Sequence, residues 1–185
     1  MDKENADFDR AYESIKSRLT AKVVPVEIPI GSGSGFTGII NLFTKKAHLF
    51  KPNTKAGEYE EAAIPASEMA RFEKYHAEMV EAVAATDDAL LERVFNGEEI
   101  PGDVEMQAMK EAMKRAELFP LLCCSSQLTW GVRTVLDFLV QLMPNAYEME
   151  EIHALKGAEG AKTVEIHPKE GDPFTALVFK TTSEN

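Results

Sequence analysis

Residues 118–143 constrain the fold of this chain more than any other stretch, because an apolar run there passes directly into a helical pattern. The run LFPLLCC at 118–124 is typical of a strand buried on both faces, as in a parallel sheet covered by helices. Ser125, Ser126 and Gln127 follow it. Apolar residues then recur at steps of three and four, which predicts an amphipathic helix lying on that sheet. Its expected buried stripe is Val132, Val135, Leu136, Leu139, Leu142 and Met143.

The loop at 125–127 has two interpretations when only its own residues are considered. In open α/β sheets, ligands bind beyond the carboxyl ends of the strands, where backbone N–H groups converge. A loop that merely turns the chain from a strand into a helix has the same composition. Both interpretations stay open at this point.

Composition and charge restrict the class of protein. The chain has 185 residues, of which 44% are hydrophobic and 28% charged, as in soluble globular proteins. The formal net charge of −11 argues against DNA or RNA as a direct partner, because phosphates would be repelled. No apolar run approaches the about 20 residues that span a bilayer, and the first residues do not resemble a signal peptide. We therefore expect a cytoplasmic protein with no membrane partner.

The two cysteines, Cys123 and Cys124, are adjacent in the apolar run. Neighbouring side chains of a strand point to opposite faces, so a disulfide between them would be strained and two reduced thiols are expected. The sequence has no second cysteine pair, and its four histidines are scattered. We expect no metal site.

Periodicity elsewhere predicts both helices and strands. Helices are expected at 8–19, 67–83, 90–95 and 103–116. Strands are expected at 24–30, 39–43, 47–50, 59–64, 164–167 and 174–181. Asn5 or Asp7 is the expected cap of the first helix, and Leu19 is placed in its buried stripe. Pro25 and Pro29 favour an edge position for the first of these strands.

The glycine-rich segment GSGSGFTG matches the spacing of dinucleotide-binding loops. Gly33, Gly35 and Gly38 satisfy G-x-G-x-x-G. That loop requires a helix directly after it, whose N–H groups bind the pyrophosphate, whereas a strand pattern follows here. We interpret the segment as a turn. No phosphate-binding loop of the form G-x-x-x-x-G-K-[ST] occurs in the sequence.

Acidic residues are concentrated in the helical block at 58–117. The block holds sixteen acidic and six basic side chains, which leaves −10 of the total charge of −11. One interpretation is a solvated face that aids solubility, and the other is a docking surface for a basic protein. A stand-alone acidic protein-interaction module is therefore one functional hypothesis.

Several motifs together resemble elongation factor G, the family of translocating GTPases of bacterial protein synthesis. They are Met1-Asp2 (the end of an N-K-M-D motif), PIG at 29–31, GIINL at 38–42, CCSS at 123–126, LMP at 142–144 and VEIHP at 164–168. The resemblance extends over nearly the whole chain. Cys124 and Ser126 stand where the family usually has Gly and Ala, which indicates a divergent paralogue. A GTPase of the ribosome-protection type is an alternative within the same architecture.

The resemblance implies an α/β fold with three parts. Residues 1–30 and 118–146 would form the C-terminal part of a GTPase domain, a partial sheet of the P-loop NTPase kind. Residues 31–117 would form the inserted α+β subdomain called G-prime. Residues 147–185 would be a linker and the first strands of a β-barrel domain II.

A partial guanine site is also implied by the resemblance. The carboxylate of Asp2 can accept hydrogen bonds from N1–H and the exocyclic amine of guanine, whereas adenine lacks a proton at N1. The loop of Ser125, Ser126 and Gln127 would offer backbone N–H groups to the guanine O6. These four are the expected cofactor-binding residues.

No catalytic residue is expected in this chain. In the family, the phosphate loop, the magnesium-binding hydroxyl and the switch segments precede the position of Met1. The chain is thus expected to be an internal piece of a longer protein that binds GTP or GDP with Mg²⁺. This piece should hydrolyse no GTP and bind guanine nucleotides only weakly.

The resemblance also implies partners. In elongation factor G, the C-terminal domain of the ribosomal stalk protein docks on G-prime. This role falls on Glu78 and Glu81, whose side chains are expected to face away from the buried stripe of their helix. The ribosome and its stalk are the expected partners, and no oligomer is expected beyond pairing of open sheet edges.

Overall fold

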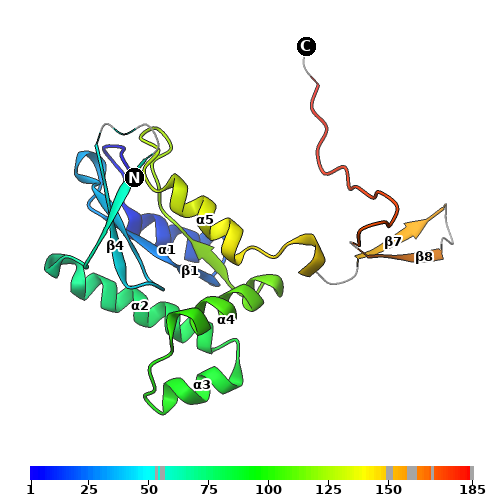
Figure 1. Cartoon of the computed structure of the whole chain (residues 1–185), viewed down its shortest axis with the longest axis horizontal. Helices are drawn as coiled ribbons and strands as arrows, with labels where there is room; N and C mark the ends of the chain where they lie inside the picture. The colour runs from blue at the N-terminus through cyan, green and yellow to red at the C-terminus, as the bar shows by residue number, and fades with distance from the viewer. Residues whose placement is uncertain (53, 55–56, 149–151, 158–161, 168, 184–185) are drawn as a thin grey trace. The chain divides into compact units, whose positions relative to one another are not determined.

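The computed structural model is a mixed α/β structure in which parallel and antiparallel strands belong to different sheets (Figure 1). It describes residues 1–52, 54, 57–148, 152–157, 162–167 and 169–183. The chain divides into two units, Met1–Met143 and Pro144–Asn185. Within the described ranges, no helix is both long and apolar enough to cross a lipid bilayer.

A short parallel pair joins the beginning and the end of the first unit. Strand β1 (Val23–Pro25) pairs with β6 (Phe119–Leu121), so segments almost a hundred positions apart lie side by side. The predicted strand at 118–124 therefore forms, but it is shorter than expected and is not buried on both faces, since Phe119 is 43% exposed. Pro120 lies opposite Val24 and has no N–H to donate, which limits the ladder.

The single strand predicted at 24–30 is wrong, because the chain changes sheets at Val26. The N–H of Val26 donates to the carbonyl of Leu121 at 3.0 Å, in the parallel pair. Its carbonyl accepts from the N–H of Leu42 at 3.0 Å, in the antiparallel sheet. That second sheet has the order β2-β3-β4-β5. Its strands are β2 (Glu27–Ile30), β3 (Gly38–Asn41), β4 (Lys46–Phe50) and β5 (Tyr59–Ala62).

Helix α1 (Phe8–Arg18) begins at the predicted cap, since the Asp7 carboxylate accepts from the backbone N–H of Arg10 at 2.9 Å. Phe8 and Tyr12 are buried, but Leu19 lies beyond the helix and is 79% exposed, contrary to expectation. Helix α1 supplies one layer of the core and contacts the longest helix of the first unit.

That longest helix is α2 (Met69–Ala84), whose buried face includes Phe72, Tyr75 and Met79. The Tyr75 hydroxyl donates to the Asp9 carboxylate of α1, which joins the two helices. Two further helices cross α2, namely α3 (Asp88–Phe95) and α4 (Gly102–Lys114) (Figure 1).

Gly102 at the start of α4 allows a close backbone approach. A Cβ at this position would lie 2.4 Å from the carbonyl oxygen of Phe43, in the turn between β3 and β4. The absence of a side chain thus lets α4 begin against that turn. The contact brings Lys45 of the turn close to the helical layer, where it pairs with Glu99.

Helix α5 (Val132–Leu142) forms where it was predicted, but its buried face matches the expected stripe only in part. Thr134, Phe138 and Leu142 are the buried residues, and the expected stripe residues Leu136 and Leu139 are 56% and 45% exposed. The parallel pair beneath α5 has only two short strands, so the helix turns toward the antiparallel sheet, where there are side chains to contact.

The second unit contains a hairpin of β7 (Ile152–Lys156) and β8 (Lys162–Ile166). The strand predicted at 164–167 thus forms as part of β8, whereas the strand predicted at 174–181 is wrong. Phe174 and Phe179 are 94% and 91% exposed, and the described residues after position 169 form no strand.

Candidate functional site

The first residues of the chain lie beside the loop that follows β6. The backbone nitrogen of Met1 donates to the carbonyl of Cys124 at 2.7 Å. On the other side, the N–H of Gly33 donates to the carbonyl of Met1 at 2.9 Å. The opening segment is thus held between the loop after β6 and the glycine-rich turn.

Asp2 lies beside Ser125, because the residues before them, Met1 and Cys124, are hydrogen-bonded to each other. A hydrogen bond from the Ser125 side chain is the main cause that holds the pKa of Asp2 below its ordinary value, against a smaller opposing effect of burial. Ser125 is itself 1% exposed, and its Oγ accepts from the N–H of Leu128 at 3.2 Å. The buried serine therefore orients a carboxylate that stays ionised at neutral pH.

The loop after Ser125 is a closed turn. The N–H of Ser125 donates to the carbonyl of Trp130 at 2.8 Å, and the Lys3 ammonium donates to Oε1 of Gln127 at 2.6 Å. Ser126 and Gln127 are exposed, and their N–H groups meet no acceptor within the described part of the chain. Two backbone donors therefore remain available beside the Asp2 carboxylate.

All four residues expected at the guanine site are thus gathered at one place, at the carboxyl ends of β1 and β6. The arrangement combines one ionised acceptor with free backbone donors. Such a set can recognise a planar group that carries both N–H donors and a carbonyl oxygen. That this group is guanine stays a prediction.

The glycine-rich turn has the structure expected of a connection. Residues Gly33–Gly35 form a 3₁₀ turn, and Gly38 begins strand β3 rather than a helix. Gly31 has a φ of 75°, and a Cβ there would lie 2.0 Å from the carbonyl oxygen of Gly35. The turn therefore requires glycine for its tightness, and no helix N-terminus follows that could receive a phosphate.

Glu78 does not face solvent as expected. Its Oε1 accepts from the Tyr12 hydroxyl at 2.5 Å and from the Lys16 ammonium at 2.7 Å, so it joins α2 to α1. These bonds lower the pKa of Glu78, although burial raises it more than either bond alone lowers it. Glu81, one turn later, is exposed. Helical spacing cannot distinguish the two, because both lie outside the apolar stripe.

A cavity lies between α5 and the antiparallel sheet, and no pattern in the sequence predicted it. Its volume is about 170 Å³. Glu27 lines it, is 2% exposed, and lies 3.4 Å from the Thr134 hydroxyl of α5. Burial raises the pKa of Glu27 to about 8. A glutamate inside the apolar segment VVPVEIPI was the signal that could have located it.

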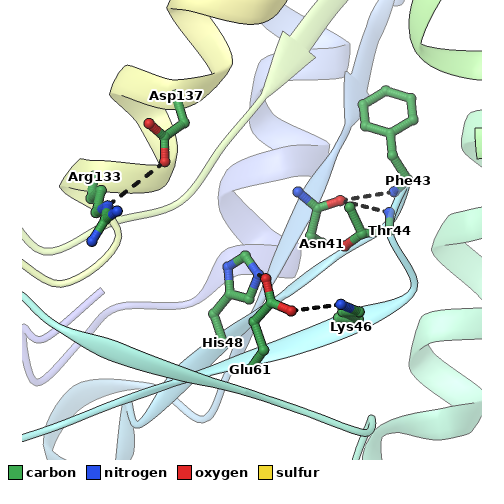
Figure 2. Close-up of polar contacts among 8 residues, drawn as sticks. All are labelled: Asn41, Phe43, Thr44, Lys46, His48, Glu61, Arg133 and Asp137. Atoms are coloured by element: carbon green, nitrogen blue, oxygen red, sulfur yellow. Dashed lines mark hydrogen bonds and ion pairs between the residues drawn. The ribbon is translucent and has the colours of Figure 1, made fainter. Parts of the chain in front are cut away.

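Figure 2 shows part of this region, including Asn41, His48 and Asp137, which line the cavity. His48 is 6% exposed and stacks on Tyr59 with ring centroids 4.3 Å apart. Arg133 and Asp137 of α5 form an ion pair at 3.9 Å. Within the described ranges, no three His, Cys, Asp or Glu side chains come close enough to hold a metal ion.

No protein-family model matches the sequence. Among solved structures, the chain is similar to a protein from Thermus thermophilus, with 28% sequence identity and a TM-score of 0.67. The match covers 82% of this chain and 23% of that protein, so the chain spans about a quarter of its length. The mixed α/β arrangement described above is therefore one that a segment of a much longer protein also adopts.

Proposed function

We propose that this chain is the guanine-recognising part of a translational GTPase of the elongation factor G type. The observation that carries the proposal is the hydrogen bond from Met1 to the carbonyl of Cys124, 123 positions away, which brings Asp2 beside Ser125. Local structure does not require that contact. It places a carboxylate and free backbone donors at the carboxyl ends of parallel strands, which is where α/β proteins bind nucleotides.

The chemistry of the site favours guanine over adenine. Asp2 accepts from N1–H and the exocyclic amine of guanine, and the N–H groups of Ser126 and Gln127 donate to O6. Adenine has an unprotonated N1, so it would leave the Asp2 carboxylate without a partner, at a cost of about 1–3 kcal/mol. Ser125 contributes by orienting Asp2, and the Lys3 ammonium lies 3.7 Å from that carboxylate.

Other features agree with a role as part of a larger protein. A parallel sheet is ordinarily covered on both faces, but here it has two strands of three residues each. Helix α5 exposes Leu136, Leu139 and Val140 on the side away from the antiparallel sheet. Additional strands and helices would cover this apolar surface. On this proposal, residues for the phosphates and Mg²⁺ belong to that remaining part, and the antiparallel sheet with α2, α3 and α4 is a G-prime subdomain.

A titration followed by NMR tests the base preference directly. We expect GMP at millimolar concentration to shift the amide resonances of Ser126 and Gln127, because its O6 accepts from these groups. AMP should leave them unchanged. The variant Asp2→Asn should lose the GMP response, and Asp137→Asn, an exposed carboxylate on α5, serves as the matched control. Equal shifts with both nucleotides would contradict the proposal.

Docking of the ribosomal stalk on the acidic helices is a separate part of the proposal. Because Glu78 already pairs with Lys16 of α1, the exposed Glu81 is the better candidate for a contact with a basic partner. Glu81→Lys should weaken binding of the stalk C-terminal domain at low salt, and unchanged affinity would remove Glu81 from the interface. A ribosome-protection GTPase remains the alternative within the family, and an acidic adaptor remains the alternative outside it.

A further inference from the structure

Glu105 on α4 is a buried acid without a hydrogen-bond partner. The residue is 1% exposed, and neither of its carboxyl oxygens is hydrogen-bonded within the described part of the chain. Nε2 of His76 on α2 lies 3.6 Å from Oε1 of Glu105, and it too has no hydrogen-bond partner among the described residues. A buried carboxyl left in this state costs about 1–3 kcal/mol, so a group that bonds to it would bind favourably.

The acid lies at a cavity of about 430 Å³ bordered by α2, α3 and the segment leading into α4. This size falls within the range of small-molecule sites, which are mostly apolar with a few polar groups. The lining of this cavity is likewise mostly apolar. Its apolar part consists of Ala77, Val80, Leu91, Val94, Phe95 and Ile100.

The charges around the cavity favour a cation. Glu81, Glu98 and Glu99 line it together with Glu105, and no Lys or Arg does. Two of these acids already have a cation as partner, Glu99 with Lys45 at 2.5 Å and Glu98 with Arg93 at 3.2 Å. Burial raises the pKa of Glu105 to about 7, while Lys45 acts in the opposite direction and Glu99 in the same one. Burial and Lys45 lower the pKa of His76, so its imidazole is neutral at neutral pH.

We infer that this cavity binds a primary ammonium group carried on an unbranched aliphatic stem. The ammonium donates to the carboxylate of Glu105 and to the neutral imidazole of His76, while the stem contacts the apolar walls. A metal ion would find only two ligating side chains at this depth, fewer than such sites require. An anion would be repelled by the acidic lining. A neutral apolar molecule would leave the carboxyl oxygens without a partner.

Two sources supply this chemistry, a free alkylamine and a lysine side chain of another protein. Both place an ammonium at the end of a methylene chain, and both suit the shape and charge of the cavity. The inference holds whether or not the chain belongs to a GTPase, because it depends on residues remote in sequence from Asp2 and Ser125.

The test is a calorimetric titration of the 185-residue protein with n-butylammonium chloride at about pH 8, above the pKa of Glu105. We expect saturable binding that is weakened at least about tenfold by Glu105→Gln, the factor that corresponds to one lost charge-assisted hydrogen bond. The variant Glu27→Gln, which neutralises the buried acid of the other cavity, is the matched control and should bind as the parent does. Affinity should fall as the pH is lowered through about 7, because Glu105 takes up a proton.

Three further measurements make the inference falsifiable. n-Butanol, with the same stem and no charge, should bind more weakly than the ammonium. Ala77→Leu, which fills the opening of the cavity without removing a charge, should also reduce binding. A peptide with one internal lysine that binds more tightly than butylammonium assigns the site to a partner's side chain, and a weaker one assigns it to a free amine. Equal affinity of the parent and Glu105→Gln, or of the amine and the alcohol, would overturn the inference.

Discussion

The two most buried glutamates of the first unit occupy contrasting surroundings. Glu27 is 2% exposed and lies at the seam between the antiparallel sheet and α5, where the Thr134 hydroxyl is 3.4 Å away. Glu105 is 1% exposed and lies between helices, with no hydrogen-bond partner in the described ranges. Burial raises the pKa of both carboxyl groups, to about 8 and about 7.

The difference indicates that Glu27 has a structural role and that Glu105 is the buried acid that can bind a ligand. The cavity beside Glu27 has a volume of about 170 Å³, and its walls combine polar side chains such as Asn41 and His48 with apolar ones such as Phe138. The cavity beside Glu105 has about 430 Å³ and largely apolar walls. The Thr134 hydroxyl lies 3.4 Å from the first carboxyl and 2.9 Å from the carbonyl of Gly131, whereas the second carboxyl has a neutral imidazole 3.6 Å away and no hydrogen-bond partner among the described residues.

The largest expected effect concerns the pH dependence of stability at Glu27. Its folded pKa of about 8 exceeds the ordinary value of 4.5, so the folded state binds the proton more tightly. Stability is therefore full below about pH 4.5 and falls as the pH rises through about 8, by roughly 5 kcal/mol. Glu27→Gln should remove that loss, as measured by urea unfolding at both ends of the range. A variant whose pH profile parallels the parent's would contradict this.

A smaller effect of the same sign is expected at Glu105. The stability lost between about pH 4.5 and the folded pKa of about 7 is roughly 3 kcal/mol. Glu105→Gln should therefore be more stable than the parent at about pH 8 and similar to it at about pH 4.5. Butylammonium should stabilise the parent and not this variant. A larger loss of unfolding free energy with pH at Glu105 than at Glu27 would contradict the expected order of the two residues.

The smallest effect is expected from removing the hydroxyl beside Glu27. Thr134→Val keeps the shape of the side chain and deletes the hydroxyl, which lies 3.4 Å from Glu27 and 2.9 Å from the carbonyl of Gly131, at a cost of about 1 kcal/mol. The pKa of Glu27 should rise further, because the hydrogen bond from Thr134 lowers it. NMR titration of the Glu27 carboxyl measures that shift. An unchanged pKa would show that Thr134 has no part in holding the group.

Local features were predictable because their causes are local. The Asp7 cap depends on a carboxylate and an N–H group three positions apart. The β3–β4 hairpin follows from two alternating runs close together in sequence, and the glycine-rich turn from the tight approach of Gly31 to Gly35. The meeting of Asp2 with Ser125 was expected only from the resemblance, since no local pattern specifies a contact across 123 positions.

The buried face of α5, the partners of Glu78 and the two cavities were not predictable, because they depend on which segments pack against one another in the folded chain. The residues of α5 permit more than one apolar face, and the antiparallel sheet selects the one that contains Thr134 and Phe138. Glu78 was expected in solvent until α1 placed Tyr12 and Lys16 beside it. The cavities of Glu27 and Glu105 are formed by segments distant in the chain.

The sequence by itself therefore determined the helices and most strands, the separation of acidic from apolar stretches, and the absence of a phosphate-binding loop among its 185 residues. These follow from spacing and composition along the chain. Only the tertiary structure decided that Val26 joins two sheets and that, among the described residues, one buried acid has a hydroxyl beside it while the other has none. The physical reason is that burial and hydrogen bonding are properties of neighbours in space, which periodicity along the chain does not specify.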